Sequence, residues 1–319
     1  MSPSKDHLYS RARQQLRESL EKVSSEDAMP ILPASWAAKA ARVTLPDIVQ
    51  GPLVKQQLDE ALIKIQHYRT IYIEWGFASV DPTGKGVVLN FYGPPGTGKT
   101  LTAEALAGSL GKPLISISIA DLESKFMGDT AKNIVQLFKH ATDEGAVLFF
   151  DEADTLLGKR LSSVTQGVDN EVNAMRSTLL IELEKHEGLV VFATNFARNY
   201  DSAFISRITQ HVKFELPAAL ERQAIWSRLM VPGIPLQKRE AVLDAVVGLS
   251  DGFSGRDIRT CIRLALPKAF AGNGSPELQL VHLEEAINQV KATLADLASD
   301  QRAHNHVKTD VARKLLGVN

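Results

Sequence analysis

The octapeptide GPPGTGKT at residues 93–100 constrains the fold of this chain more than any other feature. It matches the pattern G-x-x-x-x-G-K-[ST], a loop that joins a buried strand to the start of a helix. The flanking sequence fits this context, because the apolar run VVLNFY precedes the loop and the helix-forming TLTAEALAGSL follows it. The sequence therefore predicts a strand, a phosphate-binding loop and a helix inside an α/β sheet.

The loop residues are candidate nucleotide contacts because their types suit phosphate chemistry. Glycines allow backbone N–H groups to close around phosphates, and the Lys99 ammonium can reach the β and γ oxygens as a point charge. The Thr100 hydroxyl is a hard oxygen ligand of the kind that Mg²⁺ prefers. We therefore expect ATP and Mg²⁺ to bind at Pro95, Gly96, Thr97, Gly98, Lys99, Thr100 and Leu101.

A second apolar run, VLFFDEAD, ends in acidic residues. A P-loop enzyme needs one carboxylate to hold Mg²⁺, and a second carboxylate can orient or deprotonate the attacking water. Asp151 is the candidate for the first role and Glu152 for the second. An acidic pair at a strand end can also cap the next helix, but the upstream loop favours catalysis.

Short apolar runs alternate with helix-period segments between residues 45 and 216, which predicts a parallel sheet flanked by helices. Helical spacing places Val172, Met175, Leu179 and Leu183 on one face and Ile134, Val135, Leu137, Phe138 and Ala141 on another. Expected strands cover Val87–Tyr92, Pro113–Ile119, Ala146–Phe150 and Leu189–Thr194.

The chain divides into three predicted parts. Residues 1–43 form an N-terminal arm and linker with an amphipathic helix over Asp6–Val23, which either packs on the main body or serves oligomerisation or docking. Residues 44–216 form a large P-loop domain. Residues 217–319, where helical spacing dominates, form a small all-α lid domain that also contains the C-terminal helices.

Composition excludes several classes of protein. The chain has 44% hydrophobic residues and a net charge of −1, so it can bury a core and has no bulk attraction to nucleic acid or anionic lipid. Cys261 is the only cysteine, which leaves no internal disulfide and suits a reducing compartment. Neither a signal peptide nor a run of about 20 apolar residues is present, so we expect a soluble, cytoplasmic protein.

GPPGTGKT, FFDEAD and the later VFATN together resemble the AAA+ ATPases, and specifically their protein-remodelling AAA branch, over residues 44–265. The resemblance implies that Asn195 is the polar sensor that touches the γ-phosphate and the attacking water. It also implies that Arg207, in NYDSAFISRI, is an arginine finger that reaches a neighbouring subunit's nucleotide. This sequence has a single arginine at that place, and Arg198 is expected to be a surface residue.

Two further segments of the resemblance imply nucleotide contacts. GFSGRDIR is similar to the segment in which a lid arginine senses the γ-phosphate, a role that falls to Arg256. Arg256 could instead simply occupy the first turn of a helix opened by Ser254. LPDIVQG resembles the segment that contacts adenine, which makes Ile48 and Val49 candidate base contacts.

The resemblance also implies how hydrolysis would produce work. SKFMGDT stands where the family has a pore loop, so Phe126 and Met127 would grip a polypeptide and Gly128 would let the loop bend. Outside this context an aromatic beside a methionine is more often core. A finger that acts in trans implies a ring, most often a homohexamer, that threads or tugs a protein client.

The client is the open question. Among short-armed members of the family, the single finger, the SGR segment and the aromatic-hydrophobic pore loop together look most like the ATPases that remodel HORMA-domain proteins, including bacterial relatives in anti-phage systems. The first alternative is another AAA unfoldase, a protein extractor or a severing enzyme. An alternative of another class is a DNA-directed AAA+ loader or helicase, for which a basic pore is expected. Only Lys125 flanks the proposed pore tip, so nucleic acid is not the expected partner. A nucleotide-dependent switch with negligible turnover is disfavoured by Glu152 and Arg207.

Overall fold

The computed structural model describes residues 33–81, 86–118, 122, 129–158, 167–195, 200–271 and 276–316. The chain forms two compact units, Met1–Ala37 and Ala38–Asn319. The first contributes a short 3-10 turn, η1 (Ala34–Trp36), to the described residues. The helix predicted over Asp6–Val23 lies outside them. The second unit contains the sheet and the helices considered below.

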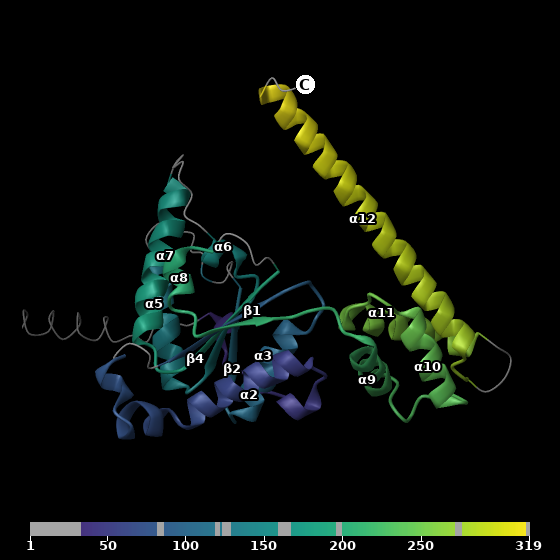
Figure 1. Ribbon diagram of the computed structural model, residues 1–319, viewed down its shortest axis with the longest axis horizontal. Helices are drawn as coiled ribbons and strands as arrows, with labels where there is room; N and C mark the ends of the chain where they lie inside the picture. Colours follow the sequence, from purple (N-terminus) through teal and green to yellow (C-terminus); the bar gives the residue numbers. More distant parts are fainter. Residues whose placement is uncertain are drawn as a thin grey trace, which may run out of the picture. The chain divides into compact units, whose positions relative to one another are not determined.

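Five parallel strands form the sheet of the second unit, in the order β2-β3-β4-β1-β5 (Figure 1). Its register pairs Tyr92 with Thr194 and Phe150 with Phe192. The carboxyl ends of β1, β3 and β4 therefore lie side by side, and ligands bind at this edge of open α/β sheets. The strands are β1 (Val87–Tyr92), β2 (Leu114–Ile117), β3 (Val147–Phe150), β4 (Leu189–Thr194) and β5 (Gln210–Lys213).

The predicted fold class is confirmed, and the strand bounds agree closely. The bounds of β1 and β4 match the prediction, whereas β2 and β3 begin one residue later, and β2 also ends earlier, at Ile117. The prediction missed β5, because three of its four residues are polar and its only buried side chain is Val212. A hydrophobic pattern carries little signal for such a strand.

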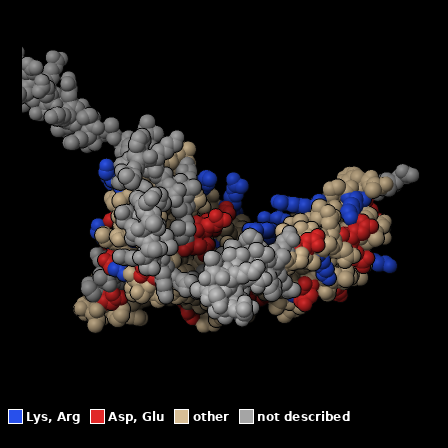
Figure 2. All heavy atoms as spheres, turned by 90° about the horizontal axis from the view of Figure 1, so that it is seen from above, with Lys and Arg blue, Asp and Glu red and all other residues tan. Residues whose placement is uncertain are grey.

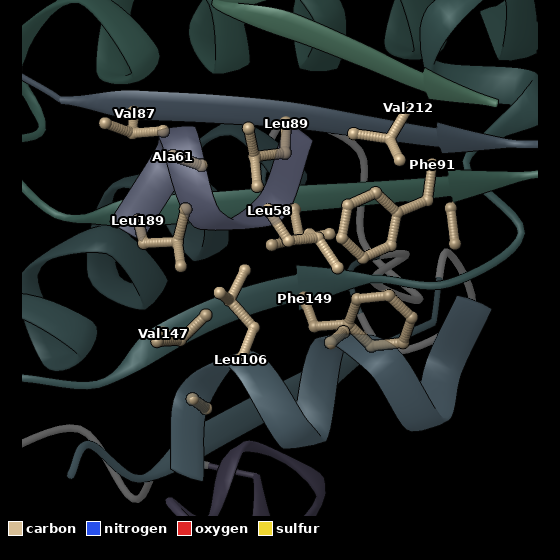
Figure 3. Close-up of a cluster of buried hydrophobic side chains, with 14 of the residues drawn as sticks. Leu58, Ala61, Val87, Leu89, Phe91, Leu106, Val147, Phe149, Leu189 and Val212 are labelled. Atoms are coloured by element: carbon tan, nitrogen blue, oxygen red, sulfur yellow. The ribbon is translucent and has the colours of Figure 1, made fainter. Parts of the chain in front are cut away.

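Helices cover both faces of the sheet. Leu58 from α2 and Leu106 from α3 pack with Leu89 and Phe149 on one face (Figure 3). On the other face the Phe138 ring of α5 stacks on Phe150 at 6.3 Å. The helices here are α2 (Pro52–Gln66), α3 (Lys99–Ser109), α5 (Asp129–Asp143), α6 (Asp154–Leu157), α7 (Gly167–Lys185) and α8 (Ser202–Ile205), with the short turns η2 (Leu45–Asp47), η3 (Arg69–Glu74) and η4 (Phe77–Ser79).

The helices after residue 217 have a hydrophobic core of their own. Trp226 is fully buried there and donates from Nε1 to Ser250 Oγ at 2.9 Å. Burial raises the pKa of the Cys261 thiol to about 12, so this cysteine stays protonated. The elements are α9 (Ala219–Leu229), α10 (Arg239–Leu249), α11 (Gly255–Ala265), η5 (Leu266–Phe270) and α12 (Leu280–Leu316).

One residue assigned to an apolar helix face proves to be exposed. Val135 is 45% exposed because the buried stripe of α5 runs through Ile134, Leu137 and Ala141, one position away. None of the described helices combines the length and the apolar character that crossing a membrane requires.

His186 predicts a pH dependence of stability. The imidazole is buried against the edge of Phe138, and this burial, with Lys112 nearby, lowers its pKa, although Glu182 and Glu187 oppose the shift. As the pH falls below about 6.5, the unfolded chain binds a proton before the folded chain does, so the free energy of unfolding decreases.

We therefore expect a lower thermal midpoint at pH 5.5 than at pH 7.5, measured by circular dichroism. His186→Leu should shrink the difference between the two midpoints, whereas His67→Gln, at an exposed histidine, should leave it as it is. An undiminished difference in His186→Leu would contradict this role.

Candidate nucleotide-binding site

A pocket of about 680 Å³ opens at the carboxyl ends of the strands. It is lined by the P-loop, the segment before α2, the ends of β3 and β4, and the start of α11. The predicted residues that line it are Ile48, Val49, Pro95, Gly96, Thr97, Gly98, Lys99, Thr100, Leu101, Asp151, Glu152, Asn195 and Arg256. The structure thus gathers residues from distant parts of the sequence around one cavity.

The P-loop backbone needs glycine at Gly96, where φ is +79° and a Cβ atom would lie 2.6 Å from the Ser254 Oγ. The loop therefore lies so close to the start of α11 that no side chain fits at Gly96. Arg256 donates its backbone N–H to the Gly96 carbonyl at 3.2 Å. Ser254 caps α11 together with Asp257, so Arg256 lies in the first turn of this helix, and it also lines the pocket.

The Lys99 ammonium is buried at the centre of the site. Its Nζ donates to the carbonyls of Gly93 at 2.8 Å and Pro94 at 2.9 Å, and to Asn195 Oδ1 at 3.0 Å. Burial lowers its pKa, and the charges of Asp151 and Asp154 act in the opposite direction. The lysine thus joins the loop to the end of β4, and neutral groups are its direct partners. A phosphate would supply the negative charge that these partners lack.

Thr100 and Asp151 present oxygen atoms that suit a hard cation. The Thr100 Oγ1 donates to Asp151 Oδ2 at 3.0 Å, while Asp151 Oδ1 accepts from the backbone N–H of Glu152 at 2.9 Å. Among the described residues, no group of three or more His, Cys, Asp or Glu side chains gathers to hold a metal ion. A hydroxyl and one carboxylate fit Mg²⁺, which keeps waters and takes further ligands from phosphates.

Glu152 is exposed in the pocket and has a φ of +52°, in the left-handed region. Such a conformation is uncommon for a non-glycine residue and clusters at functional sites. The turn from β3 to α6 therefore aims this carboxylate into the cavity. It lines the same pocket as Lys99 and Asn195.

Arg207 differs from the other predicted residues, because among the described ones it alone does not line the pocket of its own chain. It follows α8, and its Nη1 donates to the Ala203 carbonyl at 2.7 Å. Its Nη2 pairs with Glu184 of α7 at 2.5 Å, and the side chain is 28% exposed. The pore residues Phe126, Met127 and Gly128, and Arg198, lie outside the described residues.

Sequence reasoning missed the residues that line the pocket from the helical region. Arg228 donates to the Pro46 carbonyl at 3.1 Å and so reaches the segment before α2. No local motif marks these positions, although the apolar residues at helical spacing in α9 indicated a buried face. The missed lining residues include Leu216, Pro217, Ala218, Ile225, Arg228, Leu229 and Arg259.

Lys99→Ala should reduce ATP affinity at least about tenfold, because it removes the one buried cation that faces the loop and leaves the phosphate charge uncompensated. Titration calorimetry of the full chain would measure this. Lys55→Ala, on the exposed side of α2, is the matched control. Normal affinity in Lys99→Ala would contradict the phosphate role.

Known proteins with similar sequences agree with a nucleotide-binding site built on the P-loop. Residues 89–216 match the family described as ATPase family associated with various cellular activities (AAA). The chain is 31% identical to the proteasome-activating nucleotidase of Aeropyrum pernix, over 83% of this chain and 64% of that protein. It is 32% identical to spastin of Drosophila virilis, over 68% of this chain and 28% of spastin. The chain thus spans less than two thirds of these relatives.

A solved structure has a similar fold. The crystal structure of the FIGL-1 AAA domain in complex with ADP superposes with a TM-score of 0.63 at 23% identity, and covers 83% of this chain and 92% of that one. At this identity the likeness bears on the fold alone. This likeness of fold agrees with the family match over residues 89–216.

Proposed function

We propose that this chain hydrolyses ATP with Mg²⁺ and uses the energy to remodel a protein client. The proposal rests on two side-chain hydrogen bonds in one pocket. Lys99 donates to Asn195, and Thr100 donates to Asp151. These two contacts bring the ends of β1, β3 and β4 to the place where a γ-phosphate would lie. The AAA family match and the related proteasomal and spastin sequences support the same activity.

Each side chain has a defined task in this proposal. Lys99 binds phosphate oxygens, and Thr100 and Asp151 hold Mg²⁺, which would neutralise charge on the phosphates. Asn195 orients the water, since its amide both donates and accepts, and Glu152 accepts the proton of that water. Ile48 and Val49 contact the base, and Arg256 reaches the phosphates from α11.

Assembly follows from the position of Arg207. A guanidinium stabilises charge that develops on the transferred phosphoryl group, yet Arg207 lies outside its own pocket. We propose that it enters the pocket of a second copy, in a ring that is a homohexamer. We also propose the domain limits 44–216 and 217–319, which two separate hydrophobic cores support, and an arm over residues 1–43 that joins the sheet where Lys39 pairs with Leu114. The single buried Cys261 suits the cytoplasm.

For the client we propose a HORMA-domain protein of a bacterial anti-phage system, gripped by Phe126, Met127 and Gly128. The single finger at Arg207 and the SGR segment at Arg256 support this choice. Another unfoldase or extractor is the alternative. A DNA-directed loader is less favoured, because acidic and basic side chains both occur across the visible face (Figure 2) and the net charge is −1.

The experiment measures ATP turnover of the full chain against its concentration, with and without Mg²⁺. Turnover per chain should rise with concentration as rings form, and it should require Mg²⁺. Glu152→Gln is incubated with ATP and either a purified HORMA-domain protein or duplex DNA, and it should retain the protein but not the DNA on a sizing column. Turnover that is independent of concentration would oppose the ring, and retention of DNA instead would favour the loader.

A further inference from the structure

Asn90 is an unexpected residue in the middle of β1. Its side chain is fully buried, between the apolar neighbours Leu89 and Phe91. A buried amide costs free energy unless it is hydrogen-bonded, and its Oδ1 has no partner among the described residues. A leucine would fill this position without that cost. The contacts of the amide nitrogen are therefore the feature to explain.

The amide nitrogen of Asn90 joins two aromatic residues. Its Nδ2 donates to the Tyr200 hydroxyl at 3.2 Å and faces His211 Nδ1 at 3.1 Å. The Tyr200 and His211 rings stack with centroids 6.2 Å apart. Burial lowers the pKa of His211 and raises that of Tyr200, so both are neutral near pH 7 and can keep these roles. We call Asn90, Tyr200 and His211 the β1 polar cluster.

The cluster reaches the nucleotide site through Thr194. A side-chain hydrogen bond joins Tyr200 to Thr194, and the Thr194 hydroxyl donates to Asp154. Thr194 immediately precedes Asn195, whose Oδ1 contacts Lys99. The Tyr200 hydroxyl is thus two hydrogen bonds from the Asp154 carboxylate, and its partner Thr194 is one residue from the predicted sensor Asn195.

The cluster also reaches Arg207 through the backbone. Tyr200 pairs with Gly158 as an isolated bridge, and Asp201 donates its N–H to the Leu157 carbonyl at 2.8 Å. The Asp201 carboxylate accepts from Ala203 N at 2.9 Å and so caps α8. Arg207 follows α8 by two residues. A shift of Tyr200 would therefore move both the sensor turn and the segment that carries Arg207.

We propose that Asn90 and Tyr200 are positioning residues that hold Asn195 and Arg207 in a fixed relation. The inference rests on the proposed ATP hydrolysis, because it assigns the two residues to that reaction. The β1 polar cluster then couples hydrolysis in one pocket to the position of Arg207, which enters the pocket of the neighbouring chain. Neither residue lines the pocket, so both act on the rate of hydrolysis and not on ATP binding.

The test uses Tyr200→Phe, Asn90→Leu and the double variant in the full, assembled chain. Each single change should lower kcat about tenfold and leave the KM for ATP within about twofold, because small misplacements of reacting groups slow chemistry without weakening binding. Each single change also removes a hydrogen bond within the buried β1 polar cluster and should lower the thermal midpoint. The double change removes both partners of one bond, so it should melt above the less stable single variant.

The double variant separates positioning from simple stabilisation. A positioning role predicts that its kcat stays about tenfold low while its thermal midpoint recovers. Recovery of kcat together with the midpoint, or unchanged kcat in Tyr200→Phe, would overturn the inference. Tyr68→Phe, which removes the hydroxyl of a half-buried tyrosine stacked on Tyr72, is the matched control.

The same measurements keep this inference distinct from the proposed function. A wild-type chain that hydrolyses ATP, together with a Tyr200→Phe variant of equal kcat, overturns the positioning role alone. A wild-type chain without ATP turnover, under conditions in which it binds ATP, overturns both.

Discussion

Glu152→Gln should keep ATP binding and lower kcat by about 10²- to 10⁴-fold, the range expected when a general base is lost. Glutamine has the shape of glutamate but does not accept a proton from water. The side chain is exposed and lies in a turn at φ +52°, so the change should disturb neither the core nor the Thr100 and Asp151 pair. Steady-state turnover and calorimetric ATP affinity, measured on the same preparation, would separate chemistry from binding.

A matched change elsewhere controls for the lost charge. Glu144→Gln removes an exposed carboxylate from the turn after α5, away from the pocket-lining residues, and should have normal turnover. Unchanged turnover in Glu152→Gln would exclude this residue as the base. Loss of ATP affinity equal to the loss of kcat would instead indicate that the turn after β3 holds the cation.

The sheet and the P-loop site follow from local sequence patterns, which explains why they could be predicted. The strand bounds of β1 and β4 are fixed by runs of mostly apolar residues, and the candidate site residues follow the ends of β1, β3 and β4. Parallel strands bring such ends to one edge. The meeting of Lys99, Asp151 and Asn195 was therefore foreseeable once the strands were identified.

Contacts between segments far apart in the sequence were not foreseeable in the same way. The approach of Gly96 to Ser254 depends on how the helical region packs on the loop, and no motif encodes that distance. The ion pair of Arg207 with Glu184 joins the chain after α8 to α7, whose charged residues look like any solvated face. The burial of Asn90 contradicts the local pattern of its strand, so the reason for it became visible only through Tyr200 and His211.

Arg207→Ala should lower kcat about 10³-fold, the low end of the range for a lost arginine finger. The described chain holds Arg207 against Glu184, a partly exposed ion pair of the kind that contributes little stability. Release of the guanidinium on assembly is therefore not costly, and Glu184→Gln should leave turnover near the wild-type value. Arg69→Ala, at an exposed arginine paired with Glu74, controls for the loss of a surface charge.

Mixed assemblies decide whether Arg207 acts on its own nucleotide or on that of a neighbour. Arg207→Ala chains keep an intact Glu152, and Glu152→Gln chains keep an intact Arg207, so neither is active alone. In an equal mixture that exchanges into common rings, about one quarter of the interfaces combine an intact pocket with an intact finger, because each is drawn from half of the chains. Turnover should then recover to about a quarter of the wild-type value. An arginine that served its own pocket would give no recovery at any ratio. That result would contradict the proposal that each pocket needs Arg207 of a neighbouring chain.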